Sequence, residues 1–148
     1  MPAVSTRRYF AYGSNMDRAQ MRHRCPGAVL IGTARLRHHR FLINRRGVAS
    51  VVPAAARDVY GVLWNLTPPH ERALDKYEGI ATGWYYKTSV EVESTAGDTQ
   101  LAMIYIACDQ VEGLPRHGYM QRIVTAAEDF GLPEAYVGAL RSWLPPRG

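Results

Sequence analysis

Residues 9–15 read Tyr9-Phe-Ala-Tyr-Gly-Ser-Asn15 and predict the joint between a strand and a helix. The aromatic run from Tyr9 to Tyr12 is typical of a short strand, and Gly13-Ser14-Asn15 is a turn cluster. Asn15 is a favourable N-cap for a helix over residues 16–24. A glycine at such a joint also lets a ligand approach the backbone closely.

Short strands and helices alternate along the rest of the chain. Strands are predicted over residues 28–36, 39–44, 50–53, 58–66, 84–93 and 99–107, the last two as a hairpin. Helices are predicted over 67–78, 118–129 and 134–143, the first with Thr67 as its N-cap and Gly79 as its stop. With no repeat and no linker, we predict one α+β domain over residues 1–148, a small mixed β-barrel with flanking helices.

The composition is that of an ordinary globular protein. Of 148 residues, 47% are hydrophobic and 21% are charged, which argues against disorder. No apolar run is long enough to span a membrane, and no signal peptide is recognised, so no membrane partner is predicted. The two cysteines, Cys25 and Cys108, are too few for a disulfide scaffold. A cytoplasmic location is the default expectation, and monomer and homodimer both stay open.

Positive charge is concentrated in the first third of the chain. Residues 1–50 carry ten arginines and one acid, a net +9, whereas residues 51–148 carry eight bases and twelve acids, a net −4. The densest stretch is Arg35–Arg46. A basic segment raises the hypothesis of a nucleic-acid-binding domain, but charges interleaved with apolar residues are also typical of exposed strands. Because no nucleic-acid motif accompanies the charge, we predict no nucleic-acid partner.

The sequence carries none of the common signatures of cofactor or triad chemistry. It contains no GxGxxG, GxxxxGK[ST], HExxH or GxSxG pattern, and its five histidines show no metal-type spacing with acids. We therefore predict no cofactor and no metal. Ser14 would serve as a nucleophile only with a histidine brought close by the fold.

Two features remain as candidates for chemistry. The Tyr12-Gly-Ser-Asn15 joint would present free backbone N–H groups, which suit a carboxylate, although an ordinary turn has the same sequence. Glu78 ends a predicted helix among apolar and aromatic neighbours. The helix dipole and burial would both raise its pKa, as a general acid/base near neutrality requires. An ordinary surface acid is the alternative.

Together these segments resemble the γ-glutamylcyclotransferase-like (AIG2-like) family across nearly the whole chain. The segments that carry the resemblance are Tyr9–Asn15, Ala34-Arg-Leu36, Val59-Tyr-Gly-Val-Leu-Trp64, Leu74-Asp-Lys-Tyr-Glu-Gly79, Gly83-Trp-Tyr85 and Gly131-Leu-Pro-Glu-Ala-Tyr136. Their order and spacing are more specific than any one of them, and the pairing of Tyr-Gly-Ser-Asn with Glu-Gly is the most specific part.

The resemblance implies a site and a reaction. Glu78 matches the family's catalytic glutamate. The substrate-binding positions implied are Tyr9, Tyr12, Gly13, Ser14, Asn15, Tyr85 and Tyr136. In the implied acyltransferase or lyase-type reaction of glutathione metabolism, the substrate's α-amine attacks its own γ-carbonyl. 5-Oxoproline forms and an amino acid or amine leaves, so the enzyme needs a proton carrier and carbonyl donors rather than a nucleophile.

Two alternatives stay open at this point. One is a protein of the same fold that binds a γ-glutamyl-type small molecule without turning it over. The other concerns the leaving group, since the family contains enzymes for γ-glutamyl amino acids, glutathione, γ-glutamyl-ε-lysine and antibiotic amines. The Tyr-Gly-Ser-Asn form resembles the amino-acid and biosynthetic branches more closely. The basic first third of the chain would favour an anionic leaving group, whereas the cationic substrates of the antibiotic branch argue the other way if that charge lies near the pocket.

Overall fold

Five strands close into a barrel in the computed structural model of the protein, which describes residues 5–145. The strands are β1 (Arg7–Ala11), β2 (Val29–Ile43), β3 (Ala49–Leu66), β4 (Tyr85–Ser94) and β5 (Thr99–Ala107). Around the barrel they follow the order β1-β3-β2-β4-β5. The pair β1–β5, which completes the ring, is parallel, and the other pairs are antiparallel. The mixed barrel of the α+β class predicted from the sequence is confirmed.

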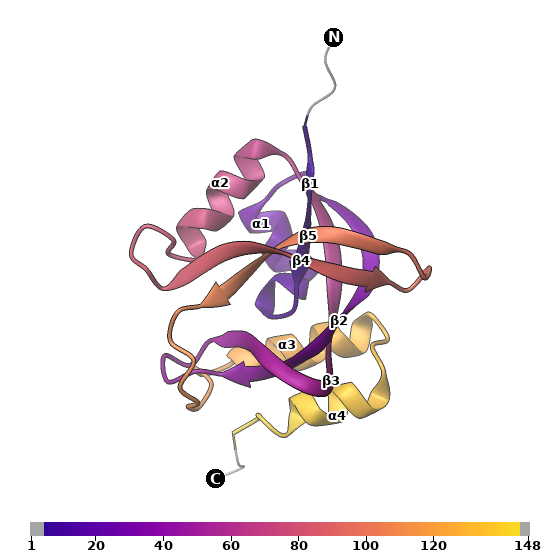
Figure 1. The fold of residues 1–148 in the computed structure, drawn as a ribbon. Helices are drawn as coiled ribbons and strands as arrows, with labels where there is room; N and C mark the ends of the chain where they lie inside the picture. The colour runs from indigo at the N-terminus through magenta and orange to yellow at the C-terminus, as the bar shows by residue number, and fades with distance from the viewer. Residues whose placement is uncertain (1–4, 146–148) are drawn as a thin grey trace.

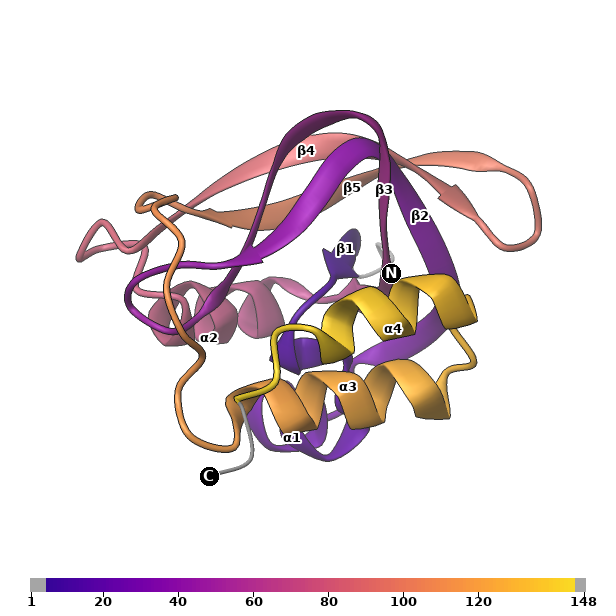
Figure 2. The same ribbon diagram turned by 90° about the horizontal axis from the view of Figure 1, so that it is seen from below.

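Helices flank the barrel on more than one side. They are the short 3-10 helix η1 (Ser14–Met16), α1 (Arg18–Arg24), α2 (Pro68–Tyr77), α3 (Tyr119–Asp129) and α4 (Glu134–Arg141). In Figures 1 and 2, α3 and α4 lie side by side, and α2 lies apart from them on another side of the barrel. None of the helices within residues 5–145 is long and apolar enough to cross a membrane.

The strands β2 and β3 form one long hairpin where the sequence predicted four separate strands. Contrary to the prediction, the strands do not end near residues 37–38 and 54–57. The ladder is interrupted between the pairs Arg37–Asp58 and His39–Pro53 and continues on either side. At those places His38 and Ala56 adopt positive φ angles of 62° and 60°, and the register jumps between Arg37 and His39. Irregularities of this kind bend a strand without ending it. The two strands arch together over the molecule in Figure 2.

The cap of the first helix differs from the prediction. Asp17, not Asn15, precedes α1, and its carboxylate accepts a hydrogen bond from the Ala19 N–H at 3.2 Å. Asn15 lies inside η1 and is 3% exposed. A buried carboxamide must find partners for its two donors and its acceptor, and the partners of Asn15 are described below as part of a cavity.

One contiguous core fills the barrel and the space beneath the helices. Its largest fully buried side chains are Phe10, Met16, Met21, Ile43, Leu63, Leu66, Leu74, Met103, Ile104, Met120 and Ile123. They come from strands, from η1 and from helices α1, α2 and α3, so the helices share the core of the barrel. This packing fixes the position of the segment after β1 relative to the end of α2.

The positive stretch on β2 is balanced by acids from later in the chain. Arg35 pairs with Glu93 at 2.8 Å and with Asp58 at 3.6 Å, and Arg37 also contacts Glu93. Hydrogen bonds from the two arginines lower the pKa of Glu93 to about 2. The interleaved charges are therefore cross-strand pairs on the outside of a barrel. Arg35 and Arg37 are therefore ion-paired.

Gly61 of β3 lies against the backbone of β1, and substitution there should be costly. A Cβ at Gly61 would lie 2.3 Å from the Ala11 carbonyl oxygen. We expect Gly61→Ala to destabilise the protein by about 2–3 kcal/mol through forced separation of the strands. The matched control is Gly138→Ala, because Gly138 lies in α4 with open space around it, and alanine should stabilise a helix there by about 0.5–1 kcal/mol. Urea unfolding should show that Gly61→Ala is less stable than wild type and that Gly138→Ala is more stable. Equal stability of Gly61→Ala and wild type would contradict the prediction.

Candidate active site

A cavity of about 430 Å³ opens where the end of β1, the end of α2 and the start of α3 come together. This volume is in the range of small-molecule sites. Its lining includes Tyr9, Tyr12, Gly13, Ser14, Asn15, Glu78 and Tyr85, seven of the eight residues singled out from the sequence. The fold thus brings together two segments that are more than sixty residues apart.

Glu78 is placed by the way α2 ends. The helix stops at Tyr77, Glu78 is its C-cap, and Gly79 follows with a φ of 67°, in the left-handed region. A Cβ at Gly79 would also lie 2.7 Å from Cε3 of Trp84, so glycine is required here by both conformation and space. The predicted helix end is confirmed, and it fixes the direction in which the Glu78 side chain leaves the backbone.

The carboxyl group of Glu78 has a pKa of about 7. Burial is the main cause of this rise, and the nearby positive charge of Arg24 and a hydrogen bond from Asn15 act in the opposite direction. The Asn15 carboxamide nitrogen donates to Oε1 of Glu78 at 3.2 Å and to the Tyr9 hydroxyl at 2.9 Å. Its oxygen accepts from Gln20 at 2.9 Å and from Arg24 at 3.0 Å. Glu78 can therefore take up and release a proton near neutral pH.

Tyrosines form much of the cavity wall, and most of their hydroxyls are held by the protein. Tyr12 donates to the Tyr105 carbonyl at 2.6 Å, and Tyr85 donates to the Ala49 carbonyl at 2.7 Å. Burial raises the pKa of Tyr9, Tyr12 and Tyr85. These rings therefore stay uncharged and give the cavity a rigid wall with fixed polar positions.

The Gly13–Asn15 segment leaves backbone donors unused by the helix it begins. Met16 is the first residue of η1 whose N–H bonds back, to the Gly13 carbonyl at 3.1 Å. The N–H groups of Ser14 and Asn15 therefore have no partner within η1. The Ser14 hydroxyl accepts a hydrogen bond from Gln20 at 2.7 Å, and within residues 5–145 no hydrogen bond joins it to a histidine. Ser14 thus has the surroundings of a binding group rather than of an activated nucleophile.

Several lining residues were not predicted from the sequence. Tyr119, the first residue of α3, accepts a hydrogen bond from the Ala49 N–H through its hydroxyl at 3.0 Å, and burial raises its pKa to about 12. Arg24 lies over the ring of Tyr77 at 4.5 Å. Others are Gln20, Arg46, Trp84, Tyr105, Arg116, His117 and Arg122. The Gly118 turn before α3 was the one local signal for Tyr119, and it marks a helix start without marking a site.

The segment before α3 borders the cavity and is tied to the turn between β2 and β3. The Arg116 N–H donates to the Gly47 carbonyl at 3.1 Å, and the Arg45 N–H donates to the Val111 carbonyl at 2.8 Å. Asn44 is fully buried and holds the Asp109 carbonyl through its side chain at 2.8 Å. This segment is therefore a fixed part of the cavity rim.

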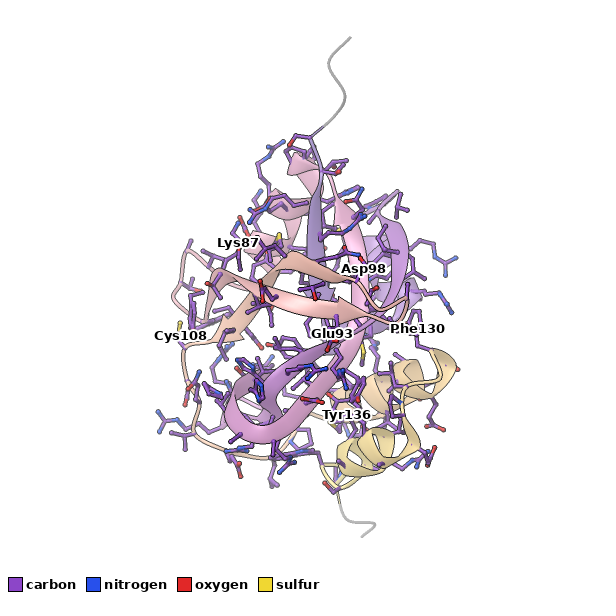
Figure 3. All side chains as sticks on the ribbon, turned by 45° about the vertical axis from the view of Figure 1, so that its right-hand side comes forward. Lys87, Glu93, Asp98, Cys108, Phe130 and Tyr136 are labelled. Atoms are coloured by element: carbon purple, nitrogen blue, oxygen red, sulfur yellow. The ribbon has the colours of Figure 1, made fainter. Side chains whose placement is uncertain are left out.

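Tyr136 lies away from the other predicted site residues. Tyr136, which is labelled in Figure 3, belongs to α4. Its ring packs against Tyr60 of β3 with centroids 5.2 Å apart. It lines a separate groove beside Trp143, and it is not among the residues that line the cavity around Glu78. The site that we describe therefore does not include Tyr136.

Comparison with known proteins places the chain in a family. The sequence model of the AIG2-like family matches residues 58–140, the segment that contains Glu78. The chain belongs to the AIG2-like family. Its relatives include the γ-glutamylcyclotransferases of Bos taurus and Mus musculus, which are 29% and 27% identical to it over 147 residues. Each match covers 93% of this chain and 78% of the relative.

The fold of this AIG2-like chain is also that of a solved γ-glutamyl cyclotransferase. That structure superposes with a TM-score of 0.89 at 25% sequence identity, covering 97% of this chain and 91% of the other. The family resemblance inferred from the sequence is therefore confirmed. Within residues 5–145, no three His, Cys, Asp or Glu side chains gather in a way that would hold a metal ion.

The raised pKa of Glu78 predicts that this AIG2-like protein is more stable without that carboxylate at alkaline pH. The folded state holds the pKa near 7 against an ordinary 4.5. The raised pKa therefore adds to the free energy of unfolding, relative to alkaline pH, in full below pH 4.5. This contribution is lost as pH rises from 4.5 through 7. Glutamine cannot ionise. We expect the free energy of unfolding of Glu78→Gln, measured relative to wild type, to be about 2 kcal/mol higher at pH 8 than at pH 5.

Urea unfolding at the two pH values measures this difference. Glu91→Gln is the matched control, because it makes the same replacement at a glutamate that is exposed on β4 and lies outside the cavity. An identical gain at pH 5 and pH 8 for Glu78→Gln would show that its carboxyl group titrates normally.

Proposed function

We propose that this protein is a γ-glutamylcyclotransferase that converts a γ-glutamyl amino acid or amine into 5-oxoproline and the free amine. The observation that carries the proposal is the position of Glu78, a carboxyl group with a pKa of about 7 inside the cavity, which accepts a hydrogen bond from Asn15 of η1. The named function of its curated relatives, which match most of the chain, supports the same reaction.

In the proposed reaction the substrate supplies its own nucleophile. Its α-amine nitrogen attacks the γ-carbonyl carbon, so that an N–C bond forms within the molecule and a five-membered ring closes. A cavity that holds the γ-glutamyl chain in its folded conformation makes this attack effectively unimolecular, which is worth an effective molarity of up to about 10⁵–10⁸ M. The rigid wall that Tyr12 and Tyr85 help to form suits that task.

Glu78 moves the protons. The attacking nitrogen begins as an ammonium and ends as a lactam N–H, so it loses two protons in all. The leaving nitrogen begins as an amide and departs as an ammonium, so it gains two. Glu78 accepts protons from the first nitrogen and passes them to the second as the C–N bond breaks. A group with a pKa near 7 is suited to both directions.

The carbonyl oxygen needs donors while it carries negative charge. The N–H groups of Ser14 and Asn15, which η1 does not use, are the donors that we assign to the γ-glutamyl group. Fixed backbone donors of this kind need no rearrangement during the reaction. Gly13 keeps the segment open, since a Cβ there would lie 3.3 Å from the Cβ of Ala49.

A binding protein of the same fold is the second candidate, and Glu78→Gln separates the two. For an enzyme, we expect kcat for 5-oxoproline release to fall by about 10²–10⁴-fold, because the proton carrier is lost. Binding of the same γ-glutamyl compound, measured by calorimetry, should be retained. The assay panel is γ-glutamyl-alanine, glutathione, γ-glutamyl-ε-lysine and a γ-glutamyl amine. Glu91→Gln is the control, with unchanged turnover. No 5-oxoproline from any of the four with wild type would favour the binding protein.

The pH dependence of turnover should report the pKa of Glu78. The carboxylate form accepts the first proton, so kcat/KM is expected to rise with pH through about 7 and to fall tenfold per pH unit well below it. Initial rates between pH 5 and pH 9 on the best substrate of the panel measure this. A rate that does not change over that range would exclude Glu78 as the proton acceptor.

A further inference from the structure

One arginine of the basic stretch Arg35–Arg46 has no acidic partner. Arg35 and Arg37 pair with acids across the barrel. Arg40 pairs with Glu112 at 2.8 Å, and Arg45 pairs with Asp109 at 2.6 Å. Within residues 5–145, no carboxylate lies within 4 Å of the Arg46 guanidinium. Arg46 is also the one member of the five that lines the cavity.

The guanidinium of Arg46 is held in place although it is unpaired. It lies over the indole ring of Trp84, 3.9 Å from the ring centroid, in a cation–π contact that restricts the side chain. Its backbone N–H donates to Asn44 at 3.0 Å, and its carbonyl accepts from the Arg116 side chain at 2.8 Å. Arg46 therefore offers five N–H donors in a fixed place at the cavity.

The position of Arg46 matches the outer part of a bound substrate. Asn15 is buried at the end of the cavity that holds the Glu78 carboxyl group, whereas Trp84 is 49% exposed and Arg116 is exposed at its opening. With the γ-carbonyl at Glu78, we infer that the amine bonded to it extends toward this opening, where Arg46 lies on Trp84.

Resting on the proposed function, we propose that Arg46 is a specificity-determining residue that binds a carboxylate of the leaving group. Its charge favours γ-glutamyl compounds whose leaving amine carries a carboxylate over those whose leaving amine is neutral or cationic. Arg116 adds positive charge at the same opening. Arg24, by contrast, is already hydrogen-bonded to Asn15 beside Glu78 and stacks on the ring of Tyr77.

The test compares γ-glutamyl-alanine with γ-glutamyl-alaninamide, which differ in the leaving-group charge and hardly in shape. For wild type, kcat/KM should be about 10- to 100-fold higher for the acid. Arg46→Met should remove this preference, mainly by raising KM for the acid. Its kcat/KM for the amide should stay within twofold of the wild-type value. Arg46→Lys should keep part of it, because the charge remains and the planar fork is lost. Arg45→Met is the matched control, since Arg45 lies in the same turn but outside the cavity, and its preference should equal that of wild type.

Equal use of acid and amide by wild type, or an equal loss on both in Arg46→Met, would overturn the proposal. The wild-type comparison needs no variant, so it decides even if Arg46→Met folds poorly. Calorimetric binding of the two compounds to Glu78→Gln separates this proposal from the proposed function. If wild type releases no 5-oxoproline from these two compounds or from the rest of the panel, the proposed function fails. Tighter binding of the acid would still support the carboxylate subsite, and equal binding would overturn it.

Discussion

The hydrogen bonds of one buried carboxamide, that of Asn15, organise the site. Its nitrogen donates to Tyr9 and Glu78, and its oxygen accepts from Gln20 and Arg24. Because an amide has a fixed donor side and a fixed acceptor side, this arrangement sets where β1, α1 and the end of α2 meet. It also moderates the chemistry. Burial alone would raise the pKa of Glu78 further, and the hydrogen bond from Asn15 helps to hold it near 7, where the carboxyl group can exchange protons in both directions.

The barrel supports a site that is unfavourable for folding. A carboxyl group whose pKa is raised by burial reduces stability at neutral and alkaline pH. The continuous core shared by strands and helices supplies the stability that offsets this. Functional groups with perturbed pKa values are tolerated where the surrounding structure over-determines their position.

Local signals made the fold class and Glu78 predictable from the sequence. The start of α2 at Pro68 and its stop at Gly79 are short-range features, so the helix end and its glutamate follow from neighbouring residues. Tyr119 was not predictable, because it reaches the cavity through a contact with Ala49, seventy positions away. The separate strands predicted on either side of His38 merged for a similar reason, since pairing with a partner strand carries β2 through an irregular residue. Tyr136 shows the limit of resemblance, because an aromatic residue in a helix carries no local signal of the face it will pack on.

The turn from Gly79 to Trp84 links the two ends of the cavity. It begins with the glycine that fixes Glu78, and the space a Cβ would take at that glycine is filled by the indole of Trp84. The guanidinium of Arg46 lies over the same indole ring. The proton carrier and the charge at the opening are thus positioned from opposite ends of one short segment, against a ring shared by both. A change in the turn that moved Trp84 would therefore disturb the chemistry and the choice of leaving group together, although Glu78 and Arg46 come from different parts of the chain.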